Sequence, residues 1–187
     1  MMLFHGTTEE NAKRIMKEGF KPDKNYNWQI KSKPGFVYLS LAYAPFYANA
    51  ANSESRNRAL IKVEVQDSEL YPDEDYVMYG LGKPKYTQAD LNKLDLEEHK
   101  WLWEKSLEYL GNVSAKPEDI TIIGCRVFDT TNLLAVCDPA ITPMNYMLMG
   151  EYYHKLTEWI YEGNNPIDFR DPIFRPSAIF DRKAQHG

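Results

Sequence analysis

Two short stretches underlie the architecture expected for this chain. They are Leu3-Phe4-His5-Gly6-Thr7, near the start, and Gly35-Phe36-Val37-Tyr38-Leu39-Ser40, further along. Each consists largely of apolar and aromatic residues of the kind that form strands, and each is followed by a segment with a helical pattern. Two strand–helix units in succession predict an α+β domain.

The first strand is expected to run straight into a helix. Thr7 and Glu10 have the spacing of a capping box, and apolar residues follow at helical spacing. Gly19, with Pro22 beyond it, predicts the end of this helix. Residues 21–34 are polar and rich in lysine, which predicts a loop long enough to cover a bound ligand.

The rest of the chain shows the same alternation of patterns. The strand expected at 120–128 is apolar on both faces, which predicts an interior place in a sheet. We find no internal repeat and no interdomain linker, so one domain is expected over 1–187, with a core to about residue 128 and a C-terminal helix and extended tail over 129–187. The other expected elements are an alanine-rich helix at 42–51, a half-buried strand at 59–65, an exposed acidic turn at 70–76, a polar helix from Thr87 to Leu110, a strand at 111–115 and a last helix from Thr142.

Length and composition place the chain among ordinary globular domains. With 187 residues, 43% of them hydrophobic and 26% charged, it can bury a core without disulfides or a structural metal. The net charge of −5 argues against a general electrostatic binder of nucleic acid. The aromatic share of 13% suggests an aromatic-rich core or a pocket that stacks a flat ligand.

Several other classes find no support in the sequence. No apolar window is long enough to cross a membrane, and the first residues lack the pattern of a signal peptide. Cys125 and Cys137 form no C-x-x-C pair, which indicates a reduced, cytoplasmic protein. The glycines and lysine of residues 79–84 lack the spacing of a phosphate loop, and no nucleophile elbow occurs. The four histidines have no zinc-ligand spacing, so no metal is expected; they are His5, His99, His154 and His186.

In their order and spacing, the two opening stretches resemble the ADP-ribosyltransferase superfamily, on the branch of diphtheria toxin and the poly-ADP-ribose polymerases. There the first strand bears His-Gly-Ser/Thr, a second reads Gly-x-x-Tyr-Phe/Leu-Ala/Ser, and a tyrosine follows on the next helix, as Tyr47 does here. The resemblance covers roughly the first 65 residues well and the rest in outline. It implies a split β-sheet core of two small antiparallel sheets at an angle, with NAD in the cleft between them and helices at the periphery.

The resemblance also implies roles for individual residues. The glycine leaves backbone groups bare for the nicotinamide carboxamide, and the histidine donates to a ribose hydroxyl. Two tyrosines sandwich the nicotinamide ring, and the start of the first helix lies near the diphosphate. The residues that would bind NAD in this way are His5, Gly6, Thr7, Tyr38, Ser40 and Tyr47, with His5 and Tyr38 also counted as catalytic.

The third family motif has no direct counterpart. In the family a catalytic glutamate opens a late strand, and the corresponding position here falls at Gly111 or Asn112. A carboxylate is needed to stabilise the oxocarbenium-like state that forms when the glycosidic bond breaks. Glu108, just before the expected strand, is therefore the predicted acid, with Glu104 next in line and Asn112 in an orienting role.

The resulting prediction is an NAD-dependent mono-ADP-ribosyltransferase. It would cleave the nicotinamide–ribose bond and transfer ADP-ribose to a macromolecular acceptor, either protein or nucleic acid. One alternative is a non-catalytic module with the same fold that binds or inhibits a partner. The other is an enzyme like the NAD-dependent RNA 2′-phosphotransferases. NAD is the expected co-substrate, no membrane partner is expected, and the default oligomeric state is a monomer.

Overall fold

A computed structural model describes residues 1–21, 35–51, 53–73, 76–77, 94–131, 133 and 142–166. The chain is a mixture of helices and strands, which confirms the α+β class. The elements are β1 (Met2–Thr8), α1 (Glu9–Glu18), β2 (Val37–Ser40), α2 (Ala44–Ala50), β3 (Asn57–Val65), β4 (Tyr71–Pro72), α4 (Leu96–Leu110), β5 (Asn112–Ala115), β6 (Ile120–Asp129) and α5 (Thr142–Tyr161).

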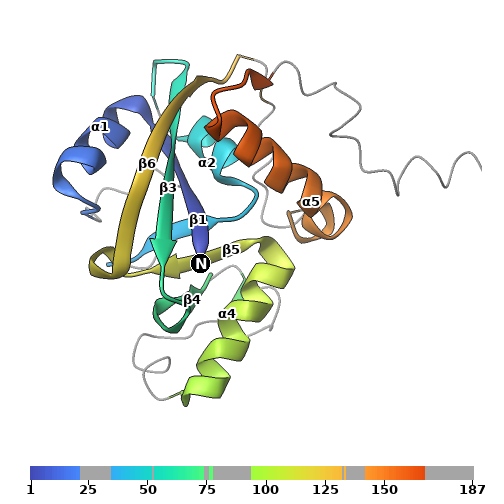
Figure 1. The fold of residues 1–187 in the computed structure, drawn as a ribbon. Coiled ribbons are helices and arrows are strands. Elements are labelled where there is room, and N and C mark those ends of the chain that lie inside the picture. The colour runs from blue at the N-terminus through green and yellow to red at the C-terminus, as the bar shows by residue number, and fades with distance from the viewer. Residues whose placement is uncertain are drawn as a thin grey trace, which may run out of the picture.

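The described strands form one antiparallel sheet in the order β4-β5-β2-β1-β3-β6. β3 pairs along the whole length of β1 and of β6, whereas β1 and β2 are in register only at Phe4 and Ser40. In Figure 1, β1, β3 and β6 run together and β5 runs across them. The structure thus differs from the expected pair of separate sheets, because the two halves are joined at the Phe4–Ser40 pair.

The two faces of the sheet are buried under different helices, α1 on one side and α2 with α5 on the other (Figure 1). Side chains alternate along a strand, so Leu3 packs into the core beneath α1 and Phe4 into the core beneath α2 and α5. In the second core, Tyr43 of the β2–α2 connection meets Tyr153 of α5 at 5.2 Å between ring centroids. Most of the aromatic residues that the structure describes lie in or against these buried clusters.

Helix α4 is amphipathic in the way its sequence predicts. Trp103 and Leu107 are buried in the core shared with α1, whereas Trp101 is 49% exposed. Asp95 begins the helix by accepting a hydrogen bond from the Glu98 backbone amide at 2.8 Å. The predicted start at Thr87 lies outside the described residues.

The predicted capping box at Thr7 is wrong by one residue. Thr8 is the N-cap of α1, where its hydroxyl accepts from the backbone amide of Asn11 at 3.1 Å. Thr7 stays extended because β1 continues to pair with β3 as far as Thr8. The end of the helix is confirmed, since Gly19 has a φ of 77° and its amide donates to the Ile15 carbonyl.

The interior position predicted for the strand at 120–128 is also wrong. β6 is the last strand of the described sheet, and Ile123 and Val127 are 48% and 43% exposed. Both faces of the strand carry apolar residues because α1 covers part of one face and α5 part of the other. An apolar pattern along a strand indicates that helices cover its two faces, but it does not indicate whether both of its edges pair with other strands.

The exposed acidic turn predicted at 70–76 is wrong for residues 71–73. Tyr71 and Pro72 pair with β5 as β4, and Asp73 is buried, its backbone amide donating to the Ser106 hydroxyl at 2.8 Å. No described helix has the length and apolar character needed to span a membrane. Residues 22–34 of the loop predicted over 21–34, the turn at 79–84, Cys137 and the residues of the predicted tail from 167 onward lie outside the described residues.

Candidate functional site

The predicted site residues of the first two motifs meet where β1 and β2 separate. The Leu41 amide donates to the Gly111 carbonyl at 2.8 Å, so the backbone groups of Ser40 and Tyr38 face β1. Continuing the register from the Phe4–Ser40 pair would place Gly6 opposite Tyr38. No such pair forms between the described strands, and the amide and carbonyl of Gly6 face the side on which β2 diverges.

The side chain of His5 accounts for this separation. Its Nδ1 lies 3.0 Å from the Tyr38 carbonyl, which is the group that Gly6 would otherwise meet. A carbonyl can only accept, so Nδ1 carries the hydrogen and Nε2 of the neutral ring is left as an acceptor. Burial lowers the pKa of His5, and the bond to the Tyr38 carbonyl offsets part of that effect. The ring of Phe20 packs edge-on against the imidazole at 5.2 Å.

This tautomer changes one detail of the predicted chemistry. The resemblance implied a histidine that donates to a ribose hydroxyl. With the hydrogen of Nδ1 committed to Tyr38, the remaining nitrogen of His5 would instead accept a hydrogen bond from such a hydroxyl.

Gly6 is required by the packing of α2. An ideal Cβ at this position would lie 1.8 Å from the carbonyl oxygen of Ala44 and 2.9 Å from the backbone nitrogen of Ala48. Both are main-chain atoms of α2, so the helix rests directly on the β1 backbone. That close approach places Tyr47, which immediately precedes Ala48 in the same helix, beside the sheet.

Tyr47 is joined to the start of β5 through its hydroxyl, which accepts a hydrogen bond from Nδ2 of Asn112. Asn112 lies opposite Ser40 in the sheet, and alternation places Tyr38 on the same face. The two tyrosines assigned to the ring of NAD are thus on one face of the sheet, and Asn112 is with them. The acceptor oxygen of the Asn112 side chain is buried and receives no hydrogen bond from the described part of the protein.

The Ser40 hydroxyl is fully engaged within the protein, and the Thr7 hydroxyl has one partner there. The Ser40 hydroxyl accepts from the amides of Ala42 and Tyr43, and it donates to the Gly111 carbonyl at 3.2 Å. These three bonds use the whole capacity of a hydroxyl, so Ser40 holds the β2–α2 connection and the start of β5 together. The Thr7 hydroxyl is buried and accepts from Nδ2 of Asn11 at 3.2 Å.

Arg58, which the sequence analysis did not single out, fixes the other end of α2. Its buried guanidinium donates to the carbonyls of Ala48 and Ala51 at 2.6 and 3.2 Å, and also to those of Ser55 and Asn57. A cation at a helix C-terminus satisfies carbonyls that have no partner inside the helix. The signal in the sequence was an arginine directly before the apolar run of β3, which begins at Ala59.

The start of β5 is also covered from α5. An ideal Cβ on Gly111 would lie 2.5 Å from the ring of Tyr146, and Gly111 has a left-handed φ of 69°. Tyr146 is held by a 3.1 Å hydrogen bond between its hydroxyl and Nε2 of His154. Burial raises the pKa of Tyr146 and lowers that of His154. Position 111 therefore requires glycine for two reasons: its φ is left-handed, and the Tyr146 ring leaves no space for a Cβ.

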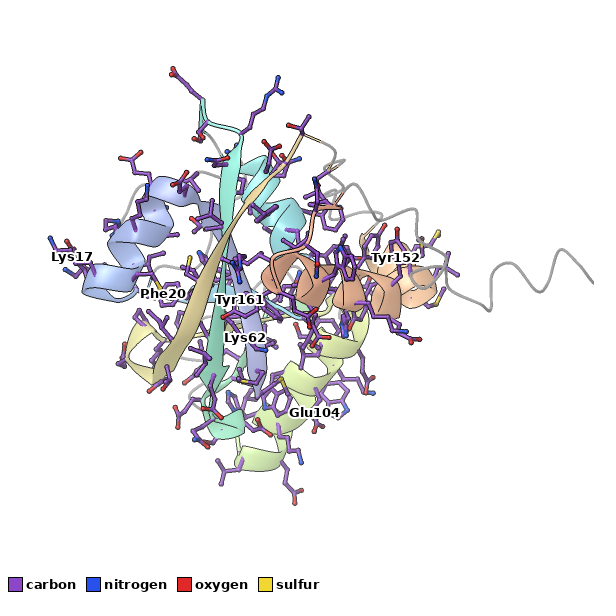
Figure 2. The ribbon with its side chains drawn as sticks, turned by 45° about the horizontal axis from the view of Figure 1, so that its top comes forward. Lys17, Phe20, Lys62, Glu104, Tyr152 and Tyr161 are labelled. Carbon is purple, nitrogen blue, oxygen red and sulfur yellow. The ribbon has the colours of Figure 1, made fainter. Side chains whose placement is uncertain are left out.

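The predicted acids lie on the solvent face of α4. Glu108 is 63% exposed and forms an ion pair with Lys105, while Glu104 pairs with Lys100 at 3.6 Å. Figure 2 shows Glu104 well apart from Phe20, which packs on His5. The structure therefore places Tyr38, Tyr47 and Asn112 on the face of the sheet beneath α2 and α5, and the His5 side chain with Phe20 on the face beneath α1. The bond from His5 to the Tyr38 backbone carbonyl joins the two at the divergence of the strands, and neither glutamate lies with them.

Comparisons with known proteins add no further information on this site. No protein-family model matches the chain, and no match was found among curated proteins or solved structures. Within the described residues, no three His, Cys, Asp or Glu side chains gather in a group that could hold a metal ion.

Proposed function

We propose that this chain binds NAD where β1 and β2 separate and acts as a mono-ADP-ribosyltransferase. The observation that supports it is the His5–Tyr38 bond, which takes the place of a ladder pair and leaves the Gly6 backbone facing the divergence of the strands. An edge of this kind offers an amide donor and a carbonyl acceptor side by side. A carboxamide, which is also both donor and acceptor, is the natural complement of that edge.

The neighbouring side chains suit the rest of the nicotinamide riboside. Tyr38 and Tyr47, on one face of the sheet, would stack against the planar ring. Nε2 of His5 would accept a hydrogen bond from a ribose hydroxyl. In the reaction the bond between the nicotinamide nitrogen and the ribose carbon breaks, nicotinamide leaves with the bonding electrons, and a nucleophile of the acceptor attacks the same carbon.

The acid in this proposal is Glu108. A carboxylate would stabilise the positive charge that develops on the ribose as the bond breaks. The side chain is exposed and is held only by Lys105, and an exposed pair of this type contributes little to stability. Separating Glu108 from Lys105 would therefore cost little, which leaves this carboxylate for a bound acceptor.

The test is nicotinamide release from NAD by the purified protein, with and without a cell extract as the source of acceptor, together with NAD binding by calorimetry. Replacing His5 by Gln should weaken NAD binding or slow turnover by about tenfold or more. His99→Gln is the matched control, because His99 is also a partly buried histidine and packs on Tyr71 near the start of α4, at the opposite end of that helix from Asn112. Absence of NAD binding by the wild-type protein would refute the proposal.

A second candidate is a non-catalytic module that captures a ligand with the same site. It is favoured by the placement of Glu108 in an exposed ion pair and by the neutral side chain of Asn112 at the start of β5. NAD binding without nicotinamide release, both alone and with extract, would identify this module. Release under either condition would exclude it.

A further inference from the structure

The side-chain oxygen of Asn112 is an unusual atom in this protein. Asn112 is 3% exposed, yet no described group donates a hydrogen bond to its Oδ1. Buried polar atoms are nearly always paired, because an unpaired acceptor has lost its hydration without compensation. An acceptor kept in this state calls for an explanation.

The surroundings of Asn112 hold this oxygen in place. Its Nδ2 donates to the Tyr47 hydroxyl, and its backbone carbonyl accepts from the Ser106 hydroxyl at 2.7 Å. The preceding residue, Gly111, lies under the ring of Tyr146 and accepts from Ser40. The backbone at the start of β5 is thus held by Ser106 and Ser40, and the Asn112 side chain is held by Tyr47 on the face of the sheet that carries Tyr38.

From this arrangement we infer that Asn112 is a ligand-binding residue whose Oδ1 accepts a hydrogen bond from NAD. The inference rests on the proposed function. Only a donor group can satisfy Oδ1, and NAD carries two kinds near the expected position: the amide hydrogens of the carboxamide and the hydroxyls of the adjoining ribose. The bond from Nδ2 to the Tyr47 hydroxyl occupies the nitrogen side of the amide and leaves Oδ1 for the ligand.

The experiment compares two variants of similar shape, one that removes the hydrogen-bond acceptor at position 112 and one that keeps it. Asn112→Leu keeps the shape and removes the acceptor, whereas Asn112→Asp keeps an acceptor and removes the amide donors. Binding of NAD, nicotinamide and ADP-ribose is measured by calorimetry at about pH 8, where a carboxylate is ionised even if burial raises its pKa moderately. Asn49→Leu is the matched control, because it removes one amide hydrogen bond on α2, from Asn49 to the Leu133 carbonyl.

The expected result is a loss of NAD affinity of about tenfold or more in Asn112→Leu, with Asn112→Asp remaining within about threefold of wild type or binding more tightly. A loss confined to ADP-ribose would identify a ribose hydroxyl as the donor, and a loss with nicotinamide would identify the carboxamide. A urea titration of each variant establishes that it is folded.

Two results would overturn the inference while the proposed function stands. One is wild-type NAD affinity in Asn112→Leu. The other is an equal loss in Asn112→Asp and Asn112→Leu, since the ligand would then be meeting the amide hydrogens. If Asn112→Leu fails to fold, Asn112→Ala takes its place, because it also removes the acceptor, and wild-type NAD affinity in that variant would overturn the inference. Failure of the wild-type protein to bind NAD would instead refute the proposed function, and this inference with it.

Discussion

Replacing Gly6 by Ala tests the contact that positions α2. The added methyl carbon would lie 1.8 Å from the Ala44 carbonyl oxygen, whereas ordinary contact begins at 3.4 Å, so α2 must move by about 1.6 Å. Neither partner is a flexible side chain, and the shift must be taken up by the helix. Overpacking of this kind costs about 1–3 kcal/mol, and the present clash belongs at the upper end. Gly6 does not have a positive φ, so alanine should also recover about 0.4–1 kcal/mol of unfolded-state entropy.

The net expectation is a loss of about 2 kcal/mol in the free energy of unfolding, or a fall in Tm of about 4–8 °C for a chain of this size. Urea denaturation followed by far-UV circular dichroism gives the first quantity. The near-UV spectrum should also change, because the shift of α2 separates Tyr47 from Asn112. Gly19→Ala is the control: it meets no neighbour but must adopt a φ of 77°, so it should lose stability while leaving the near-UV spectrum unchanged. Wild-type or higher stability in Gly6→Ala would refute the packing argument.

Three further substitutions and one pH series test other parts of the structure. Arg58→Met should lower the free energy of unfolding by about 2–4 kcal/mol in urea titrations, because it leaves buried carbonyls at the end of α2 without a donor; a loss comparable to that of an exposed residue would contradict this role. Ser106→Ala should cost about 2–3 kcal/mol, since its buried hydroxyl serves two backbone groups, and hydrogen exchange should quicken in β5. Glu108→Gln should leave the urea midpoint unchanged and reduce nicotinamide release more than NAD affinity; equal turnover would remove Glu108 as the acid. Burial lowers the pKa of His5 below 6.5, so the unfolded state binds the proton first, and stability should fall as pH drops below about 6.5. That slope should be shallower in His5→Gln, and an unchanged slope would assign the effect to another group.

Much of the local structure was predictable because it depends on near neighbours. The helix after β1 ends at Gly19 as expected, and the apolar faces of β3 and α4 are the buried ones. Position within the sheet was less predictable. β6 has two covered faces and an outer place in the described sheet, and a pattern of apolar residues does not distinguish such a strand from an interior one.

In the candidate site, too, some residues could be predicted from local sequence and others could not. The sequence pointed to His5, Gly6, Tyr38 and Tyr47 because their motifs are short and local. It pointed to Glu108 only by proximity to the expected strand, and the structure places that side chain in an exposed ion pair with Lys105. Asn112 received a minor role in the sequence analysis, yet its amide is the group that lies against Tyr47.

By itself, the sequence determined the order and type of most helices and strands, because propensity, capping and apolar periodicity act over a few residues. Only the tertiary structure decided which residues that are far apart in the chain contact one another. The His5–Tyr38 bond spans 33 positions and the Tyr47–Asn112 bond spans 65. Such contacts arise when helices and strands pack against one another, and Gly6 shows the reason most directly: its lack of a side chain matters because the backbone of α2 occupies that space.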